Sequence, residues 1–229
     1  MESTDSPMIW GSAYKSWLRE VRDQSFRDLW VETYAWENVA ADEYDVWLKE
    51  SDQNRELIDR AALMAYGESA AFDLHLEGAE AGSVWCQQAV GWHYWTGNGV
   101  AADKYLAMQY YYSAICGGSW AATLCYARLL YEVGRCDDCE RVLNDGVSCG
   151  FVPSFYWLAW FRYKRHSTRA VRKEVRPLVE HAAKEGHPAA KDLLTRWMVS
   201  GKLRLRDIPR GWLMVVQYAI GHANHEAKE

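Results

Sequence analysis

The sequence predicts an all-α solenoid built from helix-turn-helix repeats. Glycine recurs at a nearly fixed spacing, with gaps of 36, 32, 36 and 35 residues in the series Gly82, Gly118, Gly150, Gly186 and Gly221. Each of these glycines follows one amphipathic segment and precedes another. Glycine just past the last turn of a helix adopts the left-handed conformation at little cost. Only five prolines interrupt the 229 residues, so long helices are permitted. We therefore expect four helix pairs that turn at these glycines, with no strand.

The clearest unit follows the first glycine of the series. Cys86 and Gly91 stand four and nine positions after Gly82, and Ala127 and Ala159 occupy the ninth position of the next two units. Small side chains allow two helices to approach closely, so we expect these residues where the helices of a unit touch. The thiol of Cys86 should be buried for the same reason.

Prolines fit this frame because proline is tolerated in the first turn of a helix. Pro153 and Pro188 follow a glycine of the series closely, at the expected start of a first helix. Pro177 and Pro209 are expected near the start of a second helix.

The two ends of the chain are less regular. Residues 54–81 form a degenerate unit, whose first helix carries an apolar stripe of Leu57, Ala61, Met64 and Ala65. We expect residues 1–53 to form an N-terminal cap of two or three helices, since solenoids need terminal elements that cover an open face. Residues 54–221 form the array and residues 222–229 a tail.

The segment 81–118 reads AGSVWCQQAVGWHYWTGNGVAADKYLAMQYYYSAICGG. It resembles a Sel1-like repeat, and the resemblance extends more loosely over residues 54–221. This family forms helix-turn-helix arrays related to tetratricopeptide repeats. The resemblance implies a right-handed α-α superhelical solenoid that acts as a non-catalytic adaptor or scaffold for other proteins.

The resemblance also suggests a binding face, because the first helix of each unit lines the concave surface of tetratricopeptide arrays. Offsets of about +3, +6, +10, +13 and +14 from each glycine should point inward. Such positions are rich in Trp, Tyr and Arg, which are enriched in binding hot spots. We call the following residues the predicted stripe and expect them to bind a peptide or helix of a partner: Trp85, Gln88, Trp92, Trp95, Arg128, Tyr131, Tyr156, Trp160, Tyr163, Lys164 and Arg196. The alternative is that these aromatic residues pack between units.

Charge is unevenly distributed. Residues 1–82 carry 18 Asp/Glu against 7 Lys/Arg, a balance of −11, whereas residues 151–210 carry 14 Lys/Arg against 5 Asp/Glu, a balance of +9. The basic residues of the second half form a second candidate site, which we call the basic ridge. It would bind a phosphate-bearing polymer or an anionic membrane surface. The alternative is that these charges form a solvated edge. The ridge comprises Arg165, Arg169, Arg172, Lys173, Arg176, Arg204 and Arg206. A sequence pI of about 5.8 argues against nucleic acid.

No catalytic motif appears, so we expect no enzyme activity and no cofactor. Cys136 and Cys139 form a C-x-x-C without the further ligands that a structural zinc site needs, and we read them as free thiols in a loop. Cysteine-rich members of the resembled family have been proposed to be hydrolases, but no residues here support carrying that over. With no stretch of about 18 apolar residues and no targeting segment, we expect a cytoplasmic protein. The partner and oligomeric state stay open.

Overall fold

The computed structural model describes residues 24–41, 43–65, 67–203, 207–214 and 216. These residues form helices joined by turns, and no strand occurs among them, as predicted. The chain divides into two units, Met1–Gly146 and Val147–Glu229, which we describe separately.

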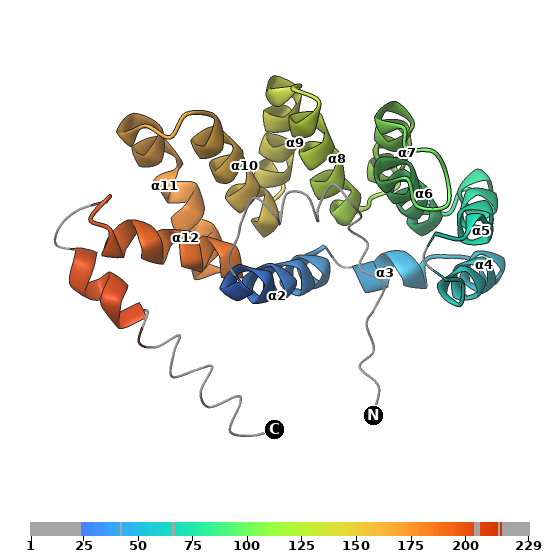
Figure 1. Cartoon of the computed structure of the whole chain (residues 1–229), viewed down its shortest axis with the longest axis horizontal. Helices are drawn as coiled ribbons and strands as arrows, with labels where there is room; N and C mark the ends of the chain where they lie inside the picture. Colours follow the sequence, from blue (N-terminus) through green and yellow to red (C-terminus); the bar gives the residue numbers. More distant parts are fainter. Residues whose placement is uncertain (1–23, 42, 66, 204–206, 215, 217–229) are drawn as a thin grey trace, which may run out of the picture. The chain divides into compact units, whose positions relative to one another are not determined.

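Unit 1 is a series of helices in which α4 to α8 each pack on the next along the chain (Figure 1). Two helices precede them, and α3 contacts both α2 and α6. The bounds are α2 Gln24–Ala40, α3 Glu43–Leu48, α4 Asp52–Ala62, α5 Ser69–Glu80, α6 Val84–Thr96, α7 Lys104–Cys116 and α8 Trp120–Glu132, followed by α9 Cys136–Ser148, which crosses into unit 2.

Unit 2 contains three further helices, α10 Val152–Arg165, α11 Arg169–Lys184 and α12 Pro188–Val199. Helix α11 packs on both α10 and α12. A further helical segment covers residues 208–214.

Four glycines of the series lie in turns between helices, which confirms the predicted frame. Their φ angles are +89° at Gly82, +96° at Gly118, +79° at Gly150 and +107° at Gly186. Each angle lies in the left-handed region, where a side chain would be strained and glycine is not. Gly221 and the tail 222–229 lie outside the described residues.

Serine completes two of these turns by capping the helix that follows. The hydroxyl of Ser83 accepts a hydrogen bond from the N–H of Cys86 at 3.0 Å, and that of Ser119 accepts one from the N–H of Ala122 at 3.0 Å. A serine hydroxyl at this position satisfies an N–H that has no partner within the helix. The Gly-Ser pair therefore ends one helix and begins the next.

The core of unit 1 combines large apolar side chains with small ones where helices meet. A cluster of Ile58, Phe72, Ala79, Cys86 and Val90 joins α4, α5 and α6. Cys86 is fully buried, as predicted.

Gly91 lies directly against the ring of Tyr111 in α7. A Cβ added at Gly91 would stand 3.0 Å from that ring. The predicted close approach of two helices is therefore confirmed at Gly91. Ala127 and Ala159 are also buried, with exposures of 1% and 0%.

Three sequence predictions about local structure are wrong. Pro177 lies in the interior of α11 rather than near its start, because the amphipathic pattern begins eight residues earlier at Arg169. Pro153 and Pro188 do occupy first turns, and Pro209 lies near the start of the segment 208–214, as predicted.

The C-x-x-C segment is helical and not a loop. Gly134, with φ of +81°, makes the turn, so Cys136 already begins α9 and Cys139 is buried in its first turn. The remaining error concerns Met64 and Ala65, which are exposed beyond the end of α4 instead of extending its apolar stripe.

Candidate functional site

The predicted stripe in unit 1 is mostly buried. Trp92 and Trp95 are 8% and 6% exposed, and Gln88 is 6% exposed. The indole N–H of Trp95 donates to Glu132 at 3.1 Å, and the Gln88 amide oxygen accepts from the Ser119 hydroxyl at 2.6 Å. These side chains tie α6 to α8 and its turn, so in this conformation they hold neighbouring repeats together.

Helix α2 accounts for the environment of Arg128, another residue of the stripe. Nη2 of Arg128 donates to Oε2 of Glu37 at 2.8 Å, and the two side chains are only 14% and 3% exposed. On the same helix, Tyr34 interacts electrostatically with Tyr111 of α7. Burial, followed by Cys125 and Tyr34, raises the pKa of Tyr111 well above its ordinary value. We call Tyr111 and Arg128 the α2 site.

A second attachment joins the N-terminal helices to α6 at Trp85. The carboxylate of Glu50 accepts from the backbone N–H of Trp85 at 3.0 Å through Oε1, and from the Asn54 amide at 3.0 Å through Oε2. Glu50 is buried, and it satisfies an N–H in the first turn of α6 that has no partner within the helix. The ring of Trp85 itself packs against the core cluster of unit 1.

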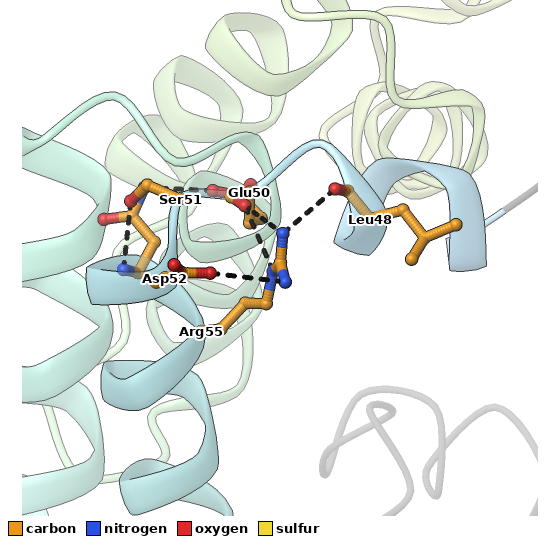
Figure 2. Close-up of polar contacts among 6 residues, drawn as sticks. Leu48, Glu50, Ser51, Asp52 and Arg55 are labelled. Carbon is orange, nitrogen blue, oxygen red and sulfur yellow. Dashed lines mark hydrogen bonds and ion pairs between the residues drawn. The ribbon is translucent and has the colours of Figure 1, made fainter.

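Arg55 fixes the backbone around this carboxylate (Figure 2). Its guanidinium donates to the carbonyl of Glu50 at 2.8 Å and to that of Leu48 at 3.2 Å. It also lies 5.2 Å above the ring of Trp47. Carbonyls at the end of α3 thus find donors, and the junction between α3 and α4 is held in one geometry.

A buried histidine pair lies beside the stripe in unit 1. Nδ1 of His75 is 2.9 Å from Nε2 of His93, whose own Nδ1 is 2.6 Å from the carbonyl oxygen of Asn98. Since a carbonyl only accepts, His93 donates through Nδ1, and His75 then donates to Nε2 of His93. Burial, and next the neighbouring His93, lowers the pKa of His75 to about 3. The pair is neutral and structural at neutral pH.

The predicted stripe is more accessible in unit 2. Tyr156 is buried, but Trp160, stacked on it with ring centroids 6.2 Å apart, is partly exposed. Tyr163 is also partly exposed and meets the ring of Trp197 edge-on at 5.1 Å. Lys164 is exposed beside it.

The two remaining members of the stripe lie one in each unit. Arg196 of α12 is exposed and paired with Asp192 at 2.8 Å, and Tyr131 of α8 is partly exposed. Among the stripe residues, the described contacts join Tyr156 and Trp160.

The basic ridge is partly neutralised. Arg176 pairs with Glu180 at 2.7 Å and with Asp207 at 3.8 Å. Arg172 lies over the ring of Tyr163 and donates to the carbonyl of Lys202 at 3.1 Å. The other described members, Arg165, Arg169 and Lys173, are exposed, and Arg204 and Arg206 fall outside the described residues.

Metal-ligating groups and cysteine thiols can be assessed in the described residues. No group of three or more His, Cys, Asp or Glu side chains there could hold a metal ion. Burial raises the pKa of Cys139 to about 12 and that of Cys86 to about 11, so both thiols stay protonated and unreactive. Among the described helices, none has the length and apolar character needed to cross a bilayer.

Sequence reasoning missed Glu37 and Glu50, the two buried carboxylates that attach the N-terminal helices. A signal existed for Glu37, because it continues the spacing of Leu29, Trp30 and Thr33 along one face of α2, and all four are buried. An acid inside an otherwise apolar stripe indicates a buried cation opposite it.

Comparisons with known proteins agree with this architecture. No protein-family model matches the sequence, and no curated protein sequence matches it. Among solved structures, the chain is similar to a Sel1 repeat protein from Oxalobacter formigenes, with a TM-score of 0.57 and 14% identity over 82% of this chain and 83% of that one. It is also similar to a protective antigen of uropathogenic Escherichia coli that displays an SLR fold, with a TM-score of 0.55 and 15% identity. That match covers 72% of this chain, which spans 37% of the antigen. The described helices therefore adopt the fold of Sel1-repeat proteins.

Proposed function

We propose that this chain is a non-catalytic interaction scaffold that binds a peptide or helical segment of a partner protein through aromatic residues of its first helices. The observation that carries the proposal is the state of Trp160 and Tyr163 in unit 2. Both rings are partly exposed, yet each rests on another ring, Trp160 on Tyr156 and Tyr163 on Trp197.

Such aromatic residues are suited to binding because their orientation is fixed before a partner arrives. An indole or phenol already packed on a neighbour loses little conformational entropy on association and offers a large apolar area. Lys164 follows Tyr163 on α10, and Arg196 precedes Trp197 on α12; both side chains are exposed. Their positive charges would favour an acidic segment in the ligand. Tyr131 of α8, at the matching offset in unit 1, is a further candidate contact.

The test is capture of partners from native lysate by the immobilised chain, followed by mass spectrometry. Trp160→Ala should weaken a captured interaction by more than about 1 kcal/mol, the level that marks a hot spot. Trp212→Ala is the matched control, because Trp212 is 56% exposed and lies outside the predicted stripe. Capture that is equal in the two variants, with both folded, would contradict the proposal.

A second candidate function uses the basic ridge. The hydrogen bond from Arg172 to the carbonyl of Lys202 joins the start of α11 to the segment after α12. Arg169 and Lys173, on the same helix as Arg172, remain exposed. Phosphate-bearing polymers or anionic membranes would suit such a surface, and their binding falls steeply with added salt. Aromatic contacts tolerate salt, so capture that disappears at high ionic strength and in Lys173→Gln would favour the ridge.

A further inference from the structure

We propose that the α2 site, formed by Tyr111 and Arg128, is a binding site for an amphipathic helix that carries a carboxylate, and that α2 is its intramolecular occupant. The inference rests on the proposed function, since Arg128 belongs to the same predicted stripe as Trp160. Beyond the proposed function, it specifies the chemistry of one partner, an acidic amphipathic helix. It also identifies α2 as the segment of this chain that competes with that partner.

The first argument concerns how α2 is attached. Helices α4 to α8 each pack on the next in sequence, whereas the ion pair of α2 reaches a residue 91 positions away. The cluster of Ile58, Phe72, Ala79, Cys86 and Val90 draws on α4, α5 and α6. Helix α2 is therefore joined to the repeat helices by a contact that is distant in sequence.

The second argument concerns what α2 presents to its site. Its buried side chains, Leu29, Trp30, Thr33 and Glu37, follow the helical repeat and form a single stripe. Its other face is exposed, with Val31 58% and Val39 82% exposed. Helix α2 buries one amphipathic face, and a helix from another protein can present the same kind of face.

The third argument is electrostatic and sets the chemistry of the partner. Arg128 is 14% exposed, and a guanidinium so far from water needs an anionic partner. Glu37 supplies it at 2.8 Å, seven residues after Trp30. A helix that displaces α2 keeps this ion pair only if it brings its own carboxylate, so the site favours acidic amphipathic helices with an aromatic residue two turns before the acid.

The experiment uses the full chain and, as probe, a fluorescent peptide of residues 24–41 of this sequence. Full-length Glu37→Gln should bind the peptide at least about tenfold more tightly than wild type, because its own α2 competes less well; tenfold corresponds to about 1.4 kcal/mol. Glu32→Gln is the matched control, since Glu32 is an exposed carboxylate on the same helix. It should bind as weakly as wild type, and a peptide carrying the Glu37→Gln change should not bind either chain.

Hydrogen exchange of the wild-type chain provides a readout that needs no variant. Saturating peptide should accelerate exchange of the α2 amides and leave those of α4 to α7 unchanged. Two results would overturn the inference: no peptide binding to a folded Glu37→Gln chain, or loss of protection in α2 and in α4 to α7 together in that variant. A stable dimer of Glu37→Gln that excludes the peptide would assign the site to a second copy and also overturn it.

These outcomes are separate from those of the capture experiment. The probe is this chain's own helix and the site lies in unit 1, whereas capture is tested at Trp160 in unit 2. Failure of one leaves the other measurement intact.

Discussion

Trp92 in unit 1 and Trp160 in unit 2 occupy the same offset from their glycines, yet their environments differ. Trp92 is 8% exposed and belongs to a unit whose first helices are covered by α2 and α3, whereas Trp160 is partly exposed and rests on Tyr156 alone among the rings described around it. Under the proposed function, one repeat position serves cohesion in one unit and recognition in another. The two positions differ in how far the surrounding chain buries the indole.

The largest expected effect compares these two tryptophans directly. Trp92→Ala should destabilise the chain by about 3–5 kcal/mol, as expected for a buried large side chain. Trp160→Ala should cost only about 1 kcal/mol, the typical cost of a single substitution. Urea unfolding followed by circular dichroism measures both values. Equal losses would remove the distinction between the two units.

The next effect tests the close approach of helices within unit 1. Gly91→Leu forces a side chain into the ring of Tyr111, which is fully buried, so overpacking should cost about 1–3 kcal/mol. Gln109→Leu on the exposed side of α7 should change stability by less than about 0.5 kcal/mol. A Gly91→Leu chain with an unchanged melting temperature would contradict the repeat frame.

A smaller effect depends on pH and arises in unit 1 from the histidine pair. The pKa of His75 is about 3 in the folded chain, against an ordinary value of 6.5. Between these pH values the unfolded chain binds a proton that the folded chain does not, so stability is full above pH 6.5 and falls as pH drops. The loss at pH 5.5 should be on the order of 1 kcal/mol, and His75→Gln should reduce it. Urea unfolding at pH 5.5 and at a pH above 6.5 measures this loss of stability. A stability that rises on acidification would exclude this environment for His75.

The last effect concerns thiol reactivity and should leave stability unchanged. Cys116 and Cys149 are exposed and should react quickly with a water-soluble alkylating reagent. Cys86 and Cys139 are buried, with pKa values raised to about 11 and 12, and should react only after unfolding. Mass spectrometry of a labelling time course orders the six sites. Early labelling of Cys139 would show that the start of α9 opens readily.

Much of the fold was predictable because its signals are local. A turn with positive φ needs glycine at that position, so Gly82, Gly118, Gly150 and Gly186 mark the helix ends without knowledge of tertiary structure. The errors were also local. Gly134, outside the regular series, made the turn before α9, and the pattern of α11 begins well before Pro177.

The environment of the candidate site was less predictable because it depends on distant contacts. Periodicity placed Arg128 on a first helix, but only the structure shows Glu37 opposite it, 91 residues away. Neither residue carries a local signal that names the other. The binding roles of the predicted stripe therefore remain predictions, to be tested at Trp160 and at the α2 site.

The separation of Glu37 from Arg128 has a consequence for synthesis on the ribosome. Chains elongate at about 5–20 residues per second, so the segment containing α2 emerges roughly 5–18 s before its site on α8 exists. Helices α4 to α7 pack on sequence neighbours and can pair as they appear. During that interval Glu37 of α2 lacks the guanidinium of Arg128 with which it pairs in the folded chain. In the nascent protein, the ion pair that attaches α2 is thus among the late contacts to form, after α4 to α7 have paired with their sequence neighbours.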